Sequence, residues 1–219
     1  MKRRLFSFAA VVLALASATF GQVDPTQVDD FEDGTTMSWR RGPSATPPSN
    51  IADGGPNGAA DRYMQVFSVP GGGDGTAVTV FNQAQWRGDF VANGIEMLRA
   101  EMANFGSEDL FMRIAIQGAG QARYGSVDAF VLPPDGLWRT VTFPLTDDTM
   151  ELIEGSMSLS DTITNVSALR INSVQSGPKW SGDRTGATLG IDRIRVPEPA
   201  SLTLVVAAGA LSLLRRRSA

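Results

Sequence analysis

Short segments with β-type patterning, separated by turn-forming residues, recur along most of this sequence and limit the folds it can adopt. The apolar positions on one face of residues 109–117 are Leu110, Met112, Ile114 and Ile116. A glycine-rich turn at 71–75 and a Pro-Pro-Asp-Gly turn at 133–136 separate such segments. Because the segments are short and closely spaced, with hardly any helical pattern, we predict an all-β protein with a two-sheet antiparallel sandwich.

The predicted strands follow from this patterning. They span residues 63–69, 76–81, 95–103, 109–117, 127–132, 137–145, 166–174 and 188–196. Residues 95–103 favour helix by intrinsic propensity, but strand formation depends on context and the neighbours of this segment are strands. The first structured element is expected at 28–34, where Phe31 is the apolar anchor. A surface loop is expected at 42–58 and a short helix around 149–153.

The first 21 residues have the three parts of a secretory signal peptide. A basic run, an apolar stretch and an Ala-Ser-Ala site occupy 2–4, 5–15 and 16–18. We expect cleavage after Ala18 or, alternatively, near Gly21. The following residues, 22–27, are polar and are expected to form a flexible leader before the domain at 28–196.

The last 23 residues carry a second targeting pattern. Pro197, Glu198 and Pro199 precede an uncharged apolar run at 200–214. As a helix this run spans about 22 Å, which is short for a hydrocarbon core of about 30 Å, and snorkelling arginines absorb such a mismatch. The arginines that follow the run are Arg215, Arg216 and Arg217. They predict a transmembrane helix with this end in the cytoplasm and the domain on the other side.

The order of Pro-Glu-Pro, apolar helix and arginine cluster at 197–219 resembles the PEP-CTERM sorting signal of exported bacterial proteins. The resemblance implies that the partner is an exosortase, a membrane transpeptidase that cleaves near the Pro-Glu-Pro. It also implies a precursor held transiently in the inner membrane, then release to the cell surface or extracellular matrix. A single-pass anchor that is never cut is the alternative.

Composition restricts the chemistry of the exported part. Six of the 19 Lys and Arg residues lie in residues 1–21 and 199–219, which contain no acidic residue, so residues 22–198 hold 13 basic residues and all 23 Asp and Glu. The resulting net charge of −10 disfavours nucleic acid as a partner and is compatible with divalent cations. The chain has no cysteine and no histidine, which excludes disulfides, thiolate nucleophiles and imidazole-based catalytic triads.

Three stretches resemble the galactose-binding-like jelly rolls, a group that includes carbohydrate-binding modules. They are Asp-Asp-Phe-Glu-Asp-Gly at 29–34, Asp-Gly-Leu-Trp-Arg-Thr-Val-Thr-Phe-Pro-Leu at 135–145 and Leu-Gly-Ile-Asp-Arg-Ile-Arg-Val at 189–196. A fourth, at 81–90, is similar to a segment of uncharacterised exported proteins with the same tail. The resemblance implies a jelly-roll sandwich that binds polysaccharide.

In such jelly rolls the first and last strands often share a structural calcium ion. Carried over to this sequence, that property makes Asp30, Glu32 and Asp192 the candidate ligands, because Ca²⁺ takes six to eight oxygens in flexible geometry. The alternative is that these acidic residues at strand ends are simply solvated.

A sugar-binding face needs exposed aromatic rings with hydrogen-bonding groups nearby. We expect Trp138 in the core, close to Val141 and Phe143, and consider Trp39, Trp86 and Trp180 as ligand-binding candidates. Of these, Trp180 is the best surface candidate because residues 176–183 have loop composition, although a loop tryptophan also caps sandwich edges.

No pattern in the sequence indicates catalysis. A glycosidase needs only two carboxylates, but nothing singles out a pair among the 23 acidic residues. We therefore predict a non-catalytic, polysaccharide-binding domain at the cell surface. The alternative is a structural matrix protein whose sandwich only self-associates.

Overall fold

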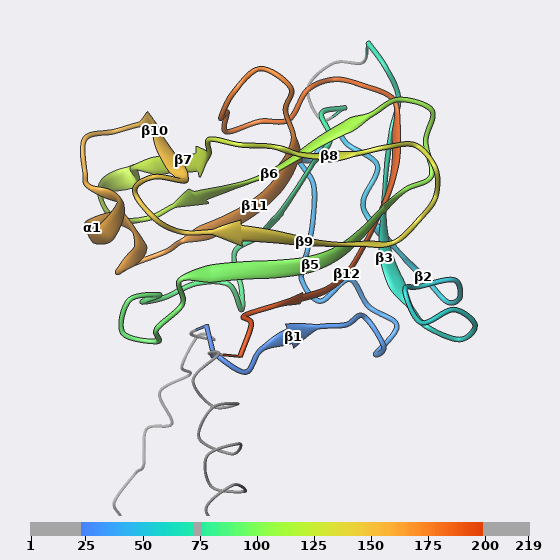
Figure 1. Ribbon diagram of the computed structural model, residues 1–219, viewed down its shortest axis with the longest axis horizontal. Helices are drawn as coiled ribbons and strands as arrows, with labels where there is room; N and C mark the ends of the chain where they lie inside the picture. Colours follow the sequence, from blue (N-terminus) through green and yellow to red (C-terminus); the bar gives the residue numbers. More distant parts are fainter. Residues whose placement is uncertain (1–22, 72–75, 199–219) are drawn as a thin grey trace, which may run out of the picture.

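The computed structural model describes residues 23–71 and 76–198, which form two antiparallel six-stranded sheets packed face to face (Figure 1). Sheet A contains β1 (Val28–Asp29), β2 (Ser49–Ile51), β3 (Tyr63–Ser68), β5 (Met97–Asn104), β9 (Arg139–Pro144) and β12 (Ala187–Arg195). Sheet B contains β4 (Thr79–Asn82), β6 (Leu110–Gln117), β7 (Arg123–Ser126), β8 (Phe130–Leu132), β10 (Met150–Glu154) and β11 (Ala168–Ser173). The predicted jelly-roll sandwich is thereby confirmed.

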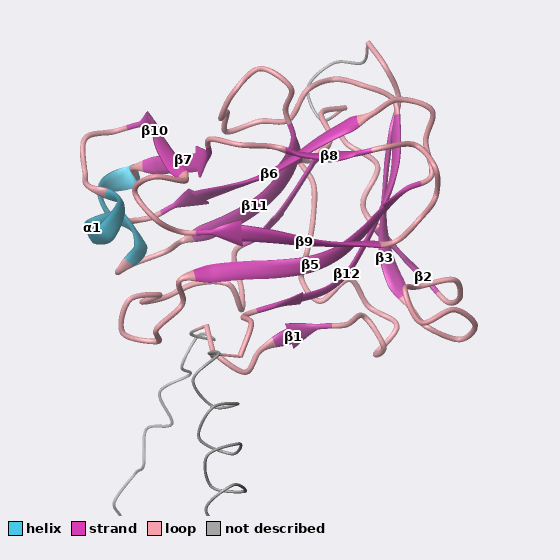
Figure 2. Ribbon diagram, in the orientation of Figure 1, coloured by secondary structure: helices cyan, strands magenta, loops and turns pink. Residues whose placement is uncertain are grey.

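Each sheet has a defined strand order. In sheet A the order is β2-β3-β12-β5-β9, with β1 paired to β12, and in sheet B it is β10-β7-β6-β11-β4, with β8 paired to β6. Neighbours in these orders are mostly far apart in sequence, so the chain crosses repeatedly between the two sheets. Within the described ranges the helical elements are a 3₁₀ turn, η1 (Ala119–Gln121), and one short helix, α1 (Leu159–Ile163), both at one end of the sandwich (Figure 2).

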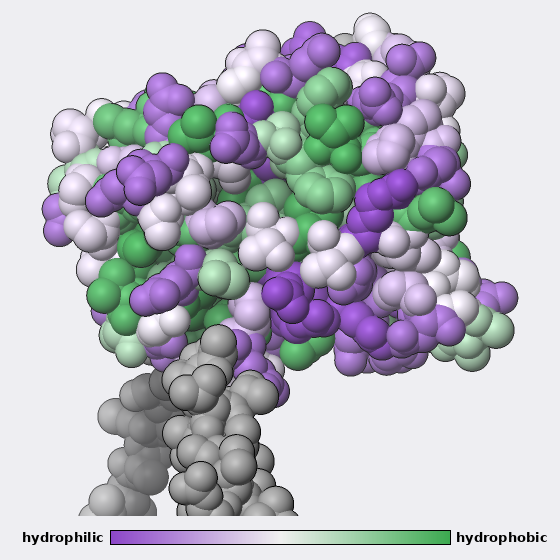
Figure 3. Space-filling model, viewed as in Figure 1, coloured by the Kyte–Doolittle hydropathy of each residue, from purple (hydrophilic) through white to green (hydrophobic). Residues whose placement is uncertain are grey.

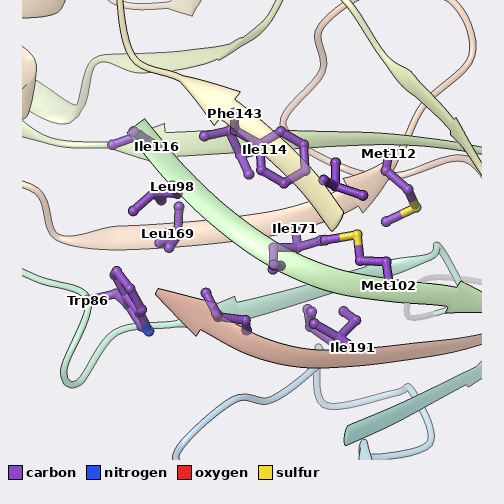
Figure 4. Close-up of a cluster of buried hydrophobic side chains, with 14 of the residues drawn as sticks. Trp86, Leu98, Met102, Met112, Ile114, Ile116, Phe143, Leu169, Ile171 and Ile191 are labelled. Carbon is purple, nitrogen blue, oxygen red and sulfur yellow. The ribbon is translucent and has the colours of Figure 1, made fainter. Parts of the chain in front are cut away.

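The core fills the space between the sheets with side chains from alternate strand positions. Sheet A contributes residues such as Met102 and Ile191, and sheet B contributes Ile114 and Ile171 (Figure 4). The alternation predicted in 109–117 is confirmed, because all four of its apolar positions are at most 1% exposed. Burying one such side chain contributes about 1.5–3 kcal/mol, so this core is the main stabilising element of a chain without cysteine.

The strand prediction for 95–103 is also confirmed, against its helix propensity. The segment becomes β5 between β12 and β9, with Leu98 and Met102 buried in the core. Two ladders of backbone hydrogen bonds and a buried face outweigh a preference of a few tenths of a kcal/mol per residue.

Three local predictions were wrong or incomplete. The segment around 149–153 is not a helix but β10, which pairs with β7 through Met150 and Ser126. The helix lies later, at α1, where Ser158 is the N-cap and its hydroxyl accepts a hydrogen bond from the Asp161 amide at 3.1 Å. The predicted loop at 42–58 contains β2, and β7 was not predicted at all.

The first and last described strands lie side by side. β1 pairs with β12 through Val28 opposite Arg195 and Asp29 opposite Ile194. No helix within residues 23–71 and 76–198 is long and apolar enough to cross a membrane. The predicted signal peptide, Pro199, the apolar run at 200–214 and the arginine cluster lie outside the described residues.

Candidate functional site

Two of the three tryptophans considered as ligand-binding residues lie in the core. Trp39 is 1% exposed and Trp86 is fully buried. Both indole Nε1 groups donate to Oδ2 of Asp29, at 2.7 Å and 2.6 Å. Neither ring has a free face, so the expectation that these residues stack on a sugar is corrected.

Asp29 joins the amino-terminal strand to this core. Its carboxylate is 1% exposed and also accepts hydrogen bonds from the side-chain amides of Gln27 and Gln85. Burial raises the pKa of Asp29, and the four donated hydrogen bonds oppose that rise. The Asp29 carboxylate therefore has a structural role, because its oxygens already accept these hydrogen bonds.

The three predicted calcium ligands do not come together as a set. Glu32 accepts a hydrogen bond from the Arg62 amide at 2.9 Å, and Asp30 accepts one from the Glu32 amide at 3.2 Å. Within the described part of the chain, no group of three or more acidic residues is placed to hold a metal ion. Glu32 therefore does not fit the calcium site implied by the jelly-roll resemblance.

Asp192, alone among the three predicted calcium ligands, has a buried carboxylate oxygen without a hydrogen-bond partner in the described part of the chain. Its side chain is fully buried, Oδ1 accepts from the Arg193 amide at 2.7 Å, and Oδ2 has no hydrogen-bond partner among the described residues. Burial raises the pKa of Asp192 to about 7, and the nearby carboxylates of Asp61 and Asp30 add to that rise. The Arg193 guanidinium lies 3.8 Å from Oδ2 and partly offsets the charge.

The remaining candidate, Trp180, lies against the outer face of sheet B. Outward positions on this sheet alternate with core positions, so Phe81 of β4 and Arg170 of β11 are cross-strand neighbours facing away from the core. The loop that follows β11, orange in Figure 1, carries Trp180 over the same face. The Trp180 ring is partly exposed.

Arginines and aromatic rings alternate across this face and form what we call the arginine–aromatic row. Its members are Arg40, Phe81, Arg170, Trp180 and Arg123. The guanidinium carbon of Arg170 lies 3.9 Å from the centre of the Trp180 ring and 5.4 Å from that of Phe81. Arg40 lies 5.5 Å from Phe81, and Arg123 lies 4.7 Å from Trp180. All four distances are within the range of cation–π attraction.

Hydrogen bonds hold the Trp180 loop in place. Arg170 donates to the Trp180 carbonyl at 3.0 Å, and the Asn172 side chain donates to the Lys179 carbonyl at 3.0 Å. The amide of Gly182 donates to Thr79 Oγ1 at 2.7 Å, and a Cβ at Gly182 would lie only 2.2 Å from the Val78 carbonyl oxygen. The loop is therefore fixed on the sheet by contacts that only a glycine permits at position 182.

A second aromatic group lies on the outer face of sheet A and was missed from the sequence. Trp138 is partly exposed, and its ring lies 5.2 Å from Tyr63 and 5.9 Å from Phe105, nearly perpendicular to both. Its Nε1 donates to the Gly54 carbonyl at 3.0 Å. Trp138 lies two residues before the exposed Thr140 of β9. Side chains two residues apart in a strand point to the same face, so the sequence already indicated that Trp138 points outward.

No protein-family model and no curated protein sequence matches this chain. Among solved structures, an exo-beta-agarase is similar over 80% of this chain, with a TM-score of 0.53 and 11% sequence identity. The match covers 25% of the agarase chain, so this chain spans about a quarter of that enzyme. At this identity the similarity shows the sandwich fold alone.

Two smaller structures match over nearly their whole length. A family 11 carbohydrate-binding module from Clostridium thermocellum, in complex with a beta-1,3-1,4-mixed-linked tetrasaccharide, has a TM-score of 0.48 and 13% identity over 78% of this chain and 94% of the module. The N-terminal cellulose-binding domain of Cellulomonas fimi beta-1,4-glucanase C has a TM-score of 0.45 and 13% identity, over 81% of this chain and 99% of that domain. The structural neighbours thus include carbohydrate-binding modules.

Proposed function

We propose that this protein is a non-catalytic, polysaccharide-binding domain and that the outer face of sheet B is its binding face. The observation that carries the proposal is the arginine–aromatic row, which runs across the strands with its side chains exposed or partly exposed. Aromatic rings pack against the apolar face of a pyranose, and guanidinium groups donate hydrogen bonds to its oxygens. A row across several strands suits an extended polymer better than a single sugar.

Export and sorting are the second part of the proposal. The signal-peptide pattern at the start of the sequence and the Pro-Glu-Pro, apolar and arginine pattern at its end support delivery by an exosortase to the cell surface or matrix. The net charge of −10 of the exported part supports a ligand other than nucleic acid.

A self-associating matrix protein is less well supported by the sheet edges. The outermost strands of the two strand orders, β2, β9, β10 and β4, have only 3, 6, 5 and 4 residues, and β9 ends at Pro144. Short edge strands resist pairing with another chain, and the proline of β9 adds to this effect in one of them. Figure 3 shows one face on which hydrophilic residues surround smaller apolar areas, one of them where β8 lies. Such scattered apolar residues are ordinary for a soluble surface.

The experiment is retention of the full chain, in mild detergent, on immobilised polysaccharides of different classes. We expect Trp180→Ala to weaken retention several-fold, because an aromatic contact contributes about 0.5–1.5 kcal/mol beyond the area that it buries. Trp138→Ala is the matched control, since it removes an outward-facing tryptophan from the opposite sheet. Loss of binding in Trp138→Ala but not in Trp180→Ala would move the site to sheet A. Absence of retention by the folded protein on every polymer would refute the proposal.

A further inference from the structure

The arginine–aromatic row on the proposed binding face contains only basic charges, although the domain is acidic. The exported part carries a net charge of −10, yet three arginines contribute to the arginine–aromatic row. Of these, Arg123 forms an ion pair with Glu154. Arg40 and Arg170 have no acidic partner within the described part of the chain. Two of the few cations of an acidic domain are therefore left unpaired on one face.

Arg170 shows the imbalance most clearly. Its side chain is partly buried, and its Nε is enclosed without a hydrogen-bond partner. Burial lowers the pKa of Arg170 to about 10, and the neighbouring charge of Arg123 adds to the effect. The group is still cationic at neutral pH. Placing a cation there beside a second cation is unfavourable unless an anion compensates, and the rings of Phe81 and Trp180 compensate only in part.

Arg40 is the accessible end of the row. It is exposed, and among the described residues its guanidinium donates one hydrogen bond, to Gln83 Oε1 at 3.1 Å. The guanidinium carbon lies 5.5 Å from the centre of the Phe81 ring, and the hydrogen bond to Gln83 uses one N–H group and leaves others to donate. A planar guanidinium held in this way matches the two oxygens of a carboxylate or sulfate.

The positions of these arginines suit a repeated anion. Arg40 bridges to β4, Arg170 lies on β11 and Arg123 lies on β7, so the row spans four neighbouring strands with β6 between β11 and β7. At about 4.8 Å between strands, the four spacings from the Arg40 segment to β7 make the row roughly 19 Å across. A polymer with acidic substituents along its length can reach several of these groups at once.

We propose that the ligand of this face is an acidic polysaccharide, whose carboxylate or sulfate groups pair with Arg40 and with the positive charge of Arg170. This inference rests on the proposed function and narrows it to one ligand class. Aromatic packing supplies the contact with the sugar rings, and the arginines select for the charge. Because exposed charges are screened by salt, affinity falls as the ionic strength rises.

The test compares polymers that differ only in charge. Full chain in mild detergent is titrated with polygalacturonate, carboxyl-reduced polygalacturonate, a sulfated galactan, its desulfated form and single-stranded DNA. We expect each acidic polysaccharide with the right substituent to bind at least tenfold more tightly than its neutral counterpart. Binding of only the carboxylated or only the sulfated polymer identifies which acid is recognised.

The variants separate specific pairing from general attraction. We expect Arg40→Gln to weaken acidic-polymer binding by about tenfold and Arg40→Lys to restore part of it, because lysine keeps the charge but loses the planar donor pair. Arg139→Gln is the control, since Arg139 pairs with Asp135 on the sheet A side. Arg170→Gln is compared only after its melting temperature is measured, and the exposed Arg40 keeps the test valid if that variant unfolds.

The outcomes distinguish the inference from the proposed function. Equal binding to the acidic polymer and to its neutral counterpart would overturn the inference and leave polysaccharide binding intact. Equal binding of single-stranded DNA would also overturn it, because attraction would then not depend on a sugar polymer. No binding to any polymer by the folded protein would overturn both.

Discussion

Trp86 donates a hydrogen bond to Asp29 at 2.6 Å, although the two residues are 57 positions apart in the sequence. The same carboxylate oxygen accepts the indole N–H of Trp39. One buried acid of β1 therefore orients both large rings at this end of the core, and the amino-terminal strand is attached through its side chain as well as its backbone.

We predict that Asp29→Ala destabilises the fold by about 2 kcal/mol or more. The substitution leaves two buried indole N–H groups without an acceptor, and each unsatisfied buried donor costs about 1–3 kcal/mol. Urea denaturation followed by tryptophan fluorescence measures the change. Asp33→Ala is the control, because Asp33 is exposed and bonds only to Thr35 nearby. Equal stability of the two variants would contradict the role assigned to Asp29.

Stability is expected to fall as the pH rises from about 4 to about 8, because Asp192 has a pKa of about 7 in the folded protein. The ordinary value is about 3.9 in the unfolded chain, so the folded state binds the proton more tightly. The stabilising effect of protonation is complete below pH 4 and is lost as the pH rises through 7. The effect is on the order of a few kcal/mol.

Denaturation midpoints at pH 5 and pH 8.5 check this prediction. Asp192→Asn keeps a neutral side chain at both pH values, so the difference between the midpoints should shrink in the variant. A difference of the same size in Asp192→Asn would show that other groups, such as Asp29 with its raised pKa, dominate the pH dependence.

If the calcium ion predicted from the jelly-roll resemblance is bound, EDTA should lower the melting temperature and excess CaCl₂ should restore it. Calcium stabilises a folded protein that binds it by mass action. The response should disappear in Asp192→Asn and persist in Glu32→Gln, because Glu32 already bonds to the Arg62 amide. A melting temperature that does not change with EDTA would exclude the ion.

We predict that Gly182→Ala weakens polysaccharide binding and lowers stability by about 1–3 kcal/mol. A Cβ at this position would lie 2.2 Å from the Val78 carbonyl oxygen, so the loop that carries Trp180 must move away from sheet B. Gly42→Ala is the control, because nothing lies within 4 Å of a Cβ there. Retention on polysaccharide and thermal melting are measured together. Unchanged binding by Gly182→Ala would mean that the loop position does not matter for the ligand.

The sequence predicted the strands well where burial alternates strictly and poorly where tertiary contacts decide. Residues 109–117 alternate without interruption, and β6 forms there as predicted. β10, at 150–154, has one buried residue at its start, so only its pairing with β7 makes it a strand. No local pattern contains that information.

The tryptophans also differ in how far their positions could be predicted from local sequence patterns. The alternation in β9 places Trp138 on the side of the exposed Thr140 and opposite the buried Val141, so its outward position was readable from the sequence. The burial of Trp39 and Trp86 was not, because it depends on an acceptor, Asp29, that comes close only in the folded sandwich. The arginine–aromatic row likewise joins residues from 40 to 180 that no spacing rule connects.

The central position of β12 in sheet A has a mechanical consequence for the proposed attachment of the protein at its carboxyl end. β12 is held on one side by β3 and on the other by β5, with β1 beside its last residues. In the proposed function, a polymer bound to sheet B would pull against that attachment, and the force would run along the axis of this strand. It must then shear the ladders on both sides at once, which demands far more force than peeling an edge strand one hydrogen bond at a time.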